Sequence, residues 1–374
     1  MTRVQTTRDA GRTRLAGIEE ALLHRMDQTA PLTDNGRQYR GMTLIELSRQ
    51  VLETSGHSTR GMSRMEVATA ALTVRAAGMM TGGDLPSLLA SVANKRMRAS
   101  YSENPGTYRA WARRAPDAVD FKPLSVVNLS ALPDLLQVNE AGEFKYGQMS
   151  NSAESYRLLS YGRLITLSRQ ALVNDDLRGF DRAVTGFGAA AARLENRTAY
   201  AQLTGNANLS DGVALFHASH ANLGTGPESA LSLASLAAMR AAMRVQRGLQ
   251  LEELNITPAY LIVPAALEQT AYQFTSSQFV PAAPGSINEF RSGGRTALVP
   301  VVDPVLDAAS PLTWYGAAAG ALVDTIEYCF LNGSDGPAID MQPGFEQDGL
   351  SIRCRHDFAA KAIDFRGLYR ANGS

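Results

Sequence analysis

The segment from Asp120 to Leu172 constrains the fold more than any other part of the chain. Its residues alternate between apolar and polar in two runs, FKPLSVVNLSALPDLLQV and GEFKYGQMSNSAESYRLLSYGRLITLSRQAL. Turn signals stand at Pro133-Asp134 and between Asn139 and Gly142. This period of two predicts a long antiparallel hairpin with few positions that are apolar on both faces. A two-stranded ribbon is only marginally stable by itself in water, so the hairpin needs another surface to pack against.

The residues before Asp120 predict helices. Apolar residues recur at helical spacing in 13–29, 43–55 and 85–101, and a loop followed by a helix is expected over 58–78. The first 80 or so residues hold few large apolar residues per turn and have no sheet of their own to pack on. They therefore predict an extended helical arm rather than a compact domain.

The longest helix is predicted over residues 174–206. Asn174 or Asp175 can accept hydrogen bonds from the free N–H groups of the first turn, and Gly205 can close the last turn. The expected apolar stripe consists of Phe187, Ala191, Leu194 and Ala201.

The remaining sequence mixes helices and strands. A helix is expected over 232–248, a buried strand over 259–264 with a helix directly after it, and further strands in ALVPVVDPVL, TWYGAAA and LVDTIEYCFLN. In the tail, Leu350, Ile352, Cys354, His356 and Phe358 alternate with Ser351, Arg353, Arg355 and Asp357, and Asp348-Gly349 offers a hairpin turn. The predicted class is α+β.

Composition limits the class of protein and the compartment in which it can work. The chain has 374 residues, enough for about two domains, and a net charge of +0. Residues 1–120 carry 17 Lys and Arg against 12 Asp and Glu, so the first third is mildly basic, which suits either nucleic acid or ordinary solvated helices. Two cysteines, Cys329 and Cys354, build neither a disulfide framework nor a Cys-rich metal cluster. No secretory signal or run of about 18–20 apolar residues occurs, which predicts a soluble intracellular chain.

The histidines in LFHASHANLG are the first candidate for chemistry. His217 and His220 stand three apart, with Ser219 between them and Asp211 upstream. Zinc sites on two histidines usually space them four apart on a helix, and a serine nucleophile needs a strained G-x-S-x-G elbow, which is absent. We therefore expect a structural loop.

Three other patterns have structural explanations. GFGAAA (186–191) matches a dinucleotide-binding pattern, but its glycines fall inside the predicted helix, where they allow close packing. Cys354 and His356 could pair for nucleophilic catalysis, although strand alternation explains both positions as core. The predicted helical stripe Arg240, Arg244 and Arg247 could bind phosphate or acidic groups, or simply face solvent. We expect no catalytic residue, cofactor or metal site.

Several segments together resemble a known family. VNEAGEFKYGQMSNSAESYRLLSYGRLITLSRQALVNDDL, LFHASHANLGTG, LNITPAYLIVPAALEQTA, VDPVLDAASPLTWYGAA, TIEYCFLNG and GLSIRCRHDFAAKAIDFRGLYRANG resemble the major capsid proteins of tailed phages and Mu-like prophages. The resemblance covers roughly residues 15–373 and is nearest to the type often fused to a prohead protease.

This resemblance implies an α+β fold of the Hong Kong 97 type. Its parts would be a helical N-terminal arm (1–115), an E-loop hairpin (116–172), a peripheral domain with a long spine helix (173–214), an axial domain (215–335), and C-terminal strands that return to the peripheral domain (336–374). The first 80 or so residues could serve as an internal scaffold, as in some relatives. Since the chain starts at Met1 with no protease domain ahead, no maturation chemistry is assigned to it. Lys122 and Lys145 fall in the hairpin, but no motif marks an acceptor, so we expect no isopeptide crosslink.

The implied function is structural and non-enzymatic: self-assembly into hexamers and pentamers of an icosahedral head shell around double-stranded DNA. The expected partners are other copies of the chain, a portal, decoration or scaffold proteins, and non-specifically bound DNA, with no membrane. The expected place is the virion capsid, assembled in the cytoplasm of the host bacterium. Two alternatives stay open: an encapsulin-like cellular compartment, and a metallohydrolase that uses His217 and His220.

Overall fold

The computed structural model describes residues 2–73, 85–129, 151–249, 251–278, 288–343 and 349–373. The chain forms two compact units. The first comprises Met1–Pro105, Ser160–Ala192 and Ser334–Asp357, and the second comprises Gly106–Leu159, Arg193–Gly333 and Phe358–Ser374. One helix, α7 (Leu177–Thr204), and one strand, β11 (Gly349–Ala362), contribute residues to both units.

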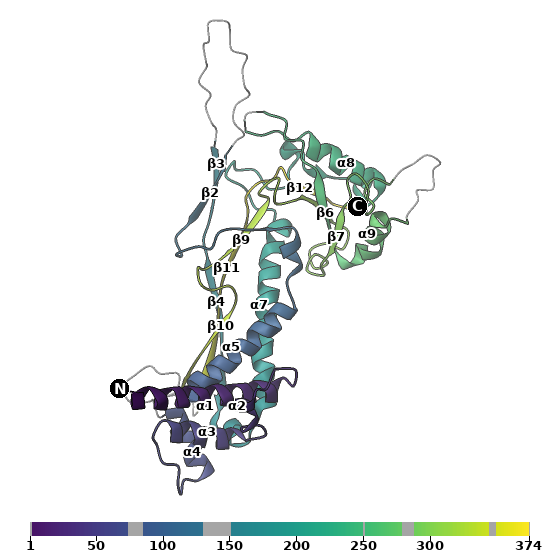
Figure 1. Cartoon of the computed structure of the whole chain (residues 1–374). Helices are drawn as coiled ribbons and strands as arrows, with labels where there is room; N and C mark the ends of the chain where they lie inside the picture. The colour runs from purple at the N-terminus through teal and green to yellow at the C-terminus, as the bar shows by residue number, and fades with distance from the viewer. Residues whose placement is uncertain are drawn as a thin grey trace. The chain divides into compact units, whose positions relative to one another are not determined.

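The first unit is mostly helical, as the sequence predicted. Its helices are α1 (Thr2–Met26), α2 (Asp34–Arg37), α3 (Leu44–Thr54), α4 (Arg64–Thr73), α5 (Leu85–Glu103), α6 (Arg169–Val173) and the first part of α7. Strands β4 (Leu159–Ser168) and β10 (Ala338–Pro343) both pair with the first part of β11 (Figure 1).

The start of α3 follows from local sequence. The Thr43 side chain accepts a hydrogen bond from the Glu46 N–H at 3.3 Å, and the Glu46 carboxylate accepts one from the Thr43 N–H at 2.7 Å. This reciprocal capping satisfies two backbone donors that the helix leaves free. The bonds from the Thr43 backbone and side chain lower the pKa of Glu46.

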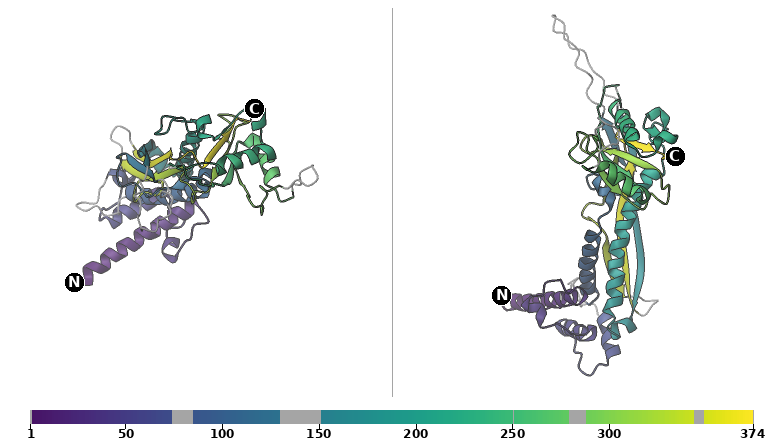
Figure 2. Two further views of the ribbon diagram at one scale, coloured as in Figure 1. Left: turned by 90° about the horizontal axis from the view of Figure 1, so that it is seen from above. Right: turned by 90° about the vertical axis from the view of Figure 1, so that its right-hand side faces the viewer.

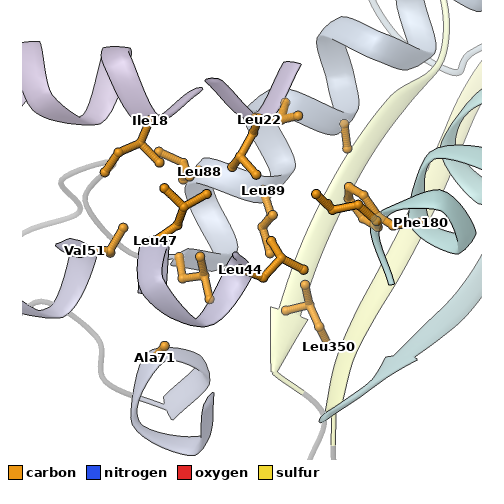
Figure 3. Packing of buried hydrophobic residues seen from close by; sticks show 14 of the residues in the cluster. Ile18, Leu22, Leu44, Leu47, Val51, Ala71, Leu88, Leu89, Phe180 and Leu350 are labelled. Carbon is orange, nitrogen blue, oxygen red and sulfur yellow. The ribbon is translucent and has the colours of Figure 1, made fainter. Parts of the chain in front are cut away.

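The first 80 or so residues have a sheet to pack on, contrary to the prediction. Residues of α1, α3, α4 and α5 pack into one hydrophobic core with α7, β10 and β11, and Figure 3 shows part of that packing. Ile18, Leu22, Leu47 and Leu89 are at most 2% exposed, and Phe180 and Leu350 belong to the same cluster. The sheet that covers these helices comes from residues about 250 positions later, so it is invisible to a reading of local sequence.

Two close contacts fix α5 in this unit. The Asn94 side chain donates to the Ile339 carbonyl and accepts from the Ile339 N–H, both at 2.8 Å, as a neighbouring strand would. At Gly188 of α7 a Cβ atom would lie 2.6 Å from the Met97 carbonyl oxygen. Gly188 therefore serves close helix packing, as predicted, whereas an added Cβ at Gly186 would have no atom within 4 Å.

Helix α7 can be followed without a break in Figures 1 and 2. Its capping residue is Asp176, whose carboxylate accepts from the Gly179 N–H at 3.0 Å, rather than the predicted Asn174 or Asp175. Asp175 has a positive φ of 60° and instead pairs with Arg25 and accepts from the Leu44 N–H.

The predicted apolar stripe of α7 is correct in part. Phe187 and Ala191 are buried and Leu194 is half-buried, but Ala201 is exposed. The buried side chains near the end of the helix are Ala199, Tyr200 and Leu203. Gly205 follows the last helical residue, and the left-handed residue that ends the run is Asn206, with φ 46°.

The second unit is built around a five-stranded sheet in the order β5-β12-β8-β6-β7. Its strands are β5 (Leu223–Gly224), β6 (Pro258–Val263), β7 (Val299–Val302), β8 (Trp314–Ala318) and β12 (Leu368–Ala371). Pairings β12–β5 and β6–β7 are parallel, whereas β12–β8 and β6–β8 are antiparallel. The strands expected over 259–264 and in TWYGAAA and ALVPVVDPVL are confirmed.

Other elements complete the second unit. Strand β1 (Arg113–Arg114) pairs in parallel with β9 (Ile326–Phe330), and β9 pairs antiparallel with the last part of β11. The helices are α8 (Leu233–Arg244), α9 (Glu268–Thr275), the last part of α7, and the 3-10 turns η1 (Thr107–Ala110), η2 (Ala218–His220), η3 (Pro227–Ser229) and η4 (Ala265–Leu267). Strands β2 (Leu124–Leu129) and β3 (Asn151–Tyr156) form a separate two-stranded sheet.

A buried polar cluster holds the last part of α7 in the second unit. The Glu195 side chain is fully buried, and it accepts from the Tyr108 hydroxyl at 2.7 Å and from Arg109 at 3.0 Å. Nearby, Asp303 accepts from Asn196 at 2.6 Å. Burial raises the pKa of Tyr108 far above its usual value, and the Glu195 carboxylate raises it further, so the phenol remains a donor.

The C-terminal strand agrees with the predicted alternation except at one residue. Leu350, Ile352, Cys354, His356 and Phe358 are all buried, and β10 and β11 pair antiparallel as a hairpin requires. Asp357, expected on the open face, is only 3% exposed, because Ser160 of β4 donates a hydrogen bond to its carboxylate. The predicted turn residue Asp348 lies outside the described residues.

Candidate functional site

The two histidines of the LFHASHANLG loop follow α7 in the chain, and the buried one is fully engaged within its unit. The Nδ1 of His220 faces the Leu215 carbonyl at 3.2 Å, and its Nε2 faces the Asp211 carboxylate at 2.8 Å. The ring also stacks on Phe365, with centroids 3.7 Å apart and planes 4° from parallel. Both ring nitrogens are occupied by the protein, which leaves neither for a metal or a substrate.

His217 has a local role as well. Its Nδ1 accepts a hydrogen bond from the Ser219 N–H at 3.2 Å and so caps η2.

Asp211, the carboxylate that faces His220, is also held within the loop. Burial raises its pKa, but hydrogen bonds from the Val213 N–H and from His220 outweigh burial, so that the pKa lies below its usual value. Over the described residues, no group of three or more His, Cys, Asp or Glu side chains is placed to hold a metal. The geometry gives the metallohydrolase hypothesis no support.

The second candidate pair, Cys354 and His356, faces the interior of the first unit. The Cys354 Sγ lies 3.9 Å from the Met97 Sδ, and burial raises the pKa of the thiol to about 11. The His356 ring, 3% exposed, meets the edge of Tyr101 with centroids 6.3 Å apart. A nucleophile requires a thiolate that substrate can reach, and this thiol is neither ionised near neutral pH nor exposed.

The predicted three-arginine stripe is wrong at Arg247. Helix α8 ends at Arg244, because the Gln246 side chain donates to the His220 carbonyl at 2.8 Å and Arg247 forms an antiparallel bridge with Glu253. Arg244 bonds Asn255 at 2.7 Å. Arg240 donates to Thr296 at 3.2 Å and lies over the Phe290 ring. These arginines are therefore engaged within the second unit.

The strand pair β2–β3 is a separate two-stranded sheet of the second unit. Its ladder runs from Leu124 opposite Tyr156 to Leu129 opposite Asn151, which confirms the predicted hairpin there. The prediction is wrong from Leu159 to Leu172, because β4 pairs with β11 and α6 is a helix. The residues between 129 and 151, which include both predicted turns and Lys145, lie outside the described residues.

One face of this strand pair is anchored. Leu124 and Tyr156 pack against a small core of Ala115, Ala118, Leu158, Cys329 and Ala359. The Tyr156 hydroxyl donates to Glu327 at 2.7 Å, and the buried Glu154 carboxylate accepts from the Ser210 N–H. These contacts hold the base of the strand pair while the opposite face remains open.

The anchored end of the strand pair, next to Leu124 and Tyr156, also exposes apolar side chains. Val119 is 81% exposed, Phe121 48% and Leu159 46%. Phe121 and Leu159 stand three residues outside the first ladder pair, one before Leu124 and one after Tyr156. We call Val119, Phe121 and Leu159 the hairpin base. Exposed apolar side chains near one end of a strand pair are candidates for contact with another molecule.

The alternating pattern predicted the strand pair but not the hairpin base. Val119 lies ahead of the alternating run, and only the ladder register shows that Phe121 and Leu159 flank the same end. Lys122, next to Phe121 in the chain, has a side chain that is 85% exposed, and its Nζ lies 3.3 Å from the Asp120 carboxylate.

No helix in the described part of the chain has the length and apolar character needed to span a membrane.

Comparisons with known proteins place this architecture. The model of the family described as phage capsid protein matches residues 152–371, more than half of the chain. None of the curated proteins compared with the chain matches it.

Solved structures give weaker likenesses. A chain from Mycobacterium phage Patience has 13% identity over 81% of this chain and 95% of its own, with a TM-score of 0.46. One from Mycobacterium phage Adephagia has 11% identity over 72% and 90%, with a TM-score of 0.44. A virus-like particle from Pyrococcus furiosus has 9% identity over 75% and 97%, with a TM-score of 0.45. These values are too low to carry an argument by themselves, so the assignment rests on the family model.

The observed α+β class is the predicted one, and it agrees with the Hong Kong 97-type fold that the resemblance implied. On the match over residues 152–371, the chain belongs to the phage capsid protein family.

Proposed function

We propose that this chain is the major subunit of the icosahedral head shell of a tailed phage, and that the shell encloses double-stranded DNA. Membership of the phage capsid protein family makes the chain a structural shell protein rather than an enzyme, as the sequence predicted. A closed shell forms when many copies repeat the same contacts under rotational symmetry. Hexamers and pentamers of the chain are the proposed building blocks.

The hairpin base carries the proposal at the level of residues. The strand pair β2–β3 has one anchored face and an end that exposes Val119, Phe121 and Leu159. Within a single copy these side chains remain in water. A neighbouring copy would bury them and would give the strand pair the support that an isolated ribbon lacks.

The proposed parts follow the Hong Kong 97-type division. The arm is 1–115, the E-loop 116–172, the spine region 173–214, the axial domain 215–335 and the returning strands 336–374. The positions of the β2–β3 pair and of α7 along the chain support the E-loop and the spine region, whereas β12 pairs with β5 and β8, which both lie within 215–335. Because α1, α3 and α5 share a core, a scaffold-like role for the first 80 or so residues would involve a folded segment.

The remaining proposed partners are a portal and decoration or scaffold proteins, and the proposed assembly site is the cytoplasm of the host bacterium. An encapsulin-like compartment is not favoured, because the matching family model describes phage capsid proteins. Shells purified from a producing cell distinguish the two. A phage head carries DNA, whereas a compartment carries one abundant cargo protein.

The decisive experiment is electron microscopy of the purified full chain at assembly concentration. We expect closed shells from the unaltered chain and their loss in a Phe121→Ser/Leu159→Ser variant whose circular dichroism is unchanged. The matched control is Leu322→Ser, an exposed apolar residue of the same unit (60% exposed) outside the hairpin base. An unaltered chain that stays monomeric would contradict the proposed function. Equal loss of shells in the control would remove the role of the hairpin base.

A further inference from the structure

Helix α7 separates its charges by sign. Its four basic residues, Arg178, Arg182, Arg193 and Arg197, are all exposed. Its acidic residues, Asp181 and Glu195, both turn towards the protein. The exposed side of this helix is therefore purely basic.

The acidic residues are already neutralised. Asp181 accepts from Arg96 of α5 at 2.9 Å within the first unit, and Glu195 accepts from Arg109 at 3.0 Å within the second. By contrast, no carboxylate in the described ranges lies within 4 Å of any of the four exposed guanidinium groups. Each unit is left with one pair of uncompensated positive charges on its own part of α7.

We call these the arginine pairs: Arg178 and Arg182 in the first unit, and Arg193 and Arg197 in the second. The members of each pair are four residues apart, so their side chains leave the helix one turn apart on the same side, with Cβ atoms about 5–6 Å from each other. Each strand of duplex DNA offers a phosphate roughly every 3.4 Å along the axis. Two guanidinium groups at this spacing can each contact a different phosphate of one strand.

The residues around the arginine pairs indicate what kind of partner fits. The other exposed residues on this side of α7 are small: Gly179, Gly186, Ala190 and Ala201. An interface with a protein usually has large apolar or aromatic side chains at its centre, and this surface has none. Interfaces with DNA are more polar and strongly basic, and guanidinium groups bind phosphate through two parallel hydrogen bonds.

We propose that the arginine pairs are contact points for the phosphodiester backbone of packaged double-stranded DNA, independent of base sequence. This inference rests on the proposed function and names the residues that would meet the DNA. Each contact is weak, and the many copies in a shell multiply its effect. A backbone contact of this kind leaves the DNA free to slide during packaging, because no base edge is read.

The test measures binding of a fluorescein-labelled 20-base-pair duplex to the purified full chain by fluorescence anisotropy at several salt concentrations. A plot of the logarithm of the association constant against the logarithm of the salt concentration has a negative slope. Its magnitude decreases by about 0.9 for each phosphate that the protein ceases to neutralise. We expect each of the double variants Arg178→Gln/Arg182→Gln and Arg193→Gln/Arg197→Gln to decrease the magnitude of this slope by roughly 1.8, whatever the base sequence of the duplex.

The control is Arg240→Gln/Arg244→Gln on α8, which has the same one-turn spacing but arginines held by Thr296 and Asn255. It should leave the slope unchanged. Slopes that stay at the unaltered value in both α7 variants, or that fall equally in the control, would overturn the inference.

Electron microscopy of the same samples separates this inference from the proposed function. Shells from both α7 variants, together with reduced slopes, support the inference. Failure of the unaltered chain to form shells counts against the proposed function, whatever the slopes are. Loss of shells in the α7 variants with unchanged slopes would assign the arginine pairs to contact between subunits and overturn the inference.

Discussion

Two glycines of α7, two residues apart, provide a matched test of how closely this helix approaches α5. Both belong to the first unit. At Gly186 an added Cβ has no atom within 4 Å, whereas at Gly188 it would lie 2.6 Å from the Met97 carbonyl oxygen and 3.0 Å from the Tyr101 nitrogen. Both atoms belong to the backbone of α5, which cannot move aside as a flexible side chain would.

The magnitude follows from these distances. Replacing a glycine inside a helix by alanine stabilises the fold by about 0.5–1 kcal/mol, because the unfolded chain loses freedom. At Gly188, ordinary contact at 3.4 Å would require the helices to separate by roughly 0.8 Å, the difference from 2.6 Å. Overpacking of this kind costs about 1–3 kcal/mol. Since the propensity gain cancels between the two variants, Gly186→Ala should be about 1–3 kcal/mol more stable than Gly188→Ala.

Thermal unfolding of the purified chain measures this difference. At about 2–4 °C per kcal/mol for 150–250 residues, the gap in Tm is roughly 2–12 °C. Far-UV circular dichroism follows the helices of both units, while tryptophan fluorescence follows the second unit through Trp111 and Trp314, both buried there. A Gly188→Ala variant as stable as Gly186→Ala would show that α5 and α7 are not in backbone contact.

Three further predictions concern buried groups. Cys329 and Cys354 are at most 7% exposed, and burial raises the pKa of Cys354 to about 11, so Ellman's reagent should find no fast-reacting thiol in the folded chain at pH 8 and two in guanidinium chloride. Fast labelling of either thiol before unfolding would contradict this. Tyr108→Phe removes a hydrogen-bond donor from the buried Glu195 carboxylate, so it should lower the free energy of unfolding, measured by urea titration, by about 1–3 kcal/mol. A change of less than about 0.3 kcal/mol would argue against this hydrogen bond. Asn94→Ala leaves two backbone groups of β10 without partners and should cost about 2–3 kcal/mol in the same titration, whereas a neutral result would mean that water replaces the side chain.

Much of the secondary structure could be predicted because its causes are local. Thr43 and Glu46 cap α3 from three residues apart, and the apolar run of β6 identifies a buried strand wherever it lies in the chain. The period-two alternation likewise predicted the β2–β3 pair, which requires only that two nearby segments face each other.

The errors arose where distant residues decide the outcome. Asp175 fits the pattern of a capping residue, but Arg25 and the Leu44 N–H, more than 130 residues earlier in the chain, bind its carboxylate, and Asp176 caps the helix instead. The first 80 or so residues seemed to lack a sheet because their sheet is formed by β10 and β11 near the other end of the chain.

The hairpin base and the arginine pairs also depend on contacts that the sequence alone does not reveal. The hairpin base needs the ladder register, which places Phe121 and Leu159 at one end of two strands. The arginine pairs of α7 are visible in the sequence at four-residue spacing, as were Arg240 and Arg244. Only the structure separates them, because Arg240 and Arg244 hydrogen-bond to Thr296 and Asn255 within their unit, whereas the α7 arginines have no side-chain hydrogen bond or ion pair among the described residues.

The contact between Asn94 and Ile339 has a consequence for a chain that must work at very high local concentration. An open strand edge offers its N–H and C=O groups to any other extended segment and so invites disordered stacking of subunits. At Ile339 both groups are already bonded to a side chain of α5, which lies along the outer edge of β10. A growing shell therefore meets no free edge at this position. Its copies must associate through surfaces whose shape and charge select one arrangement.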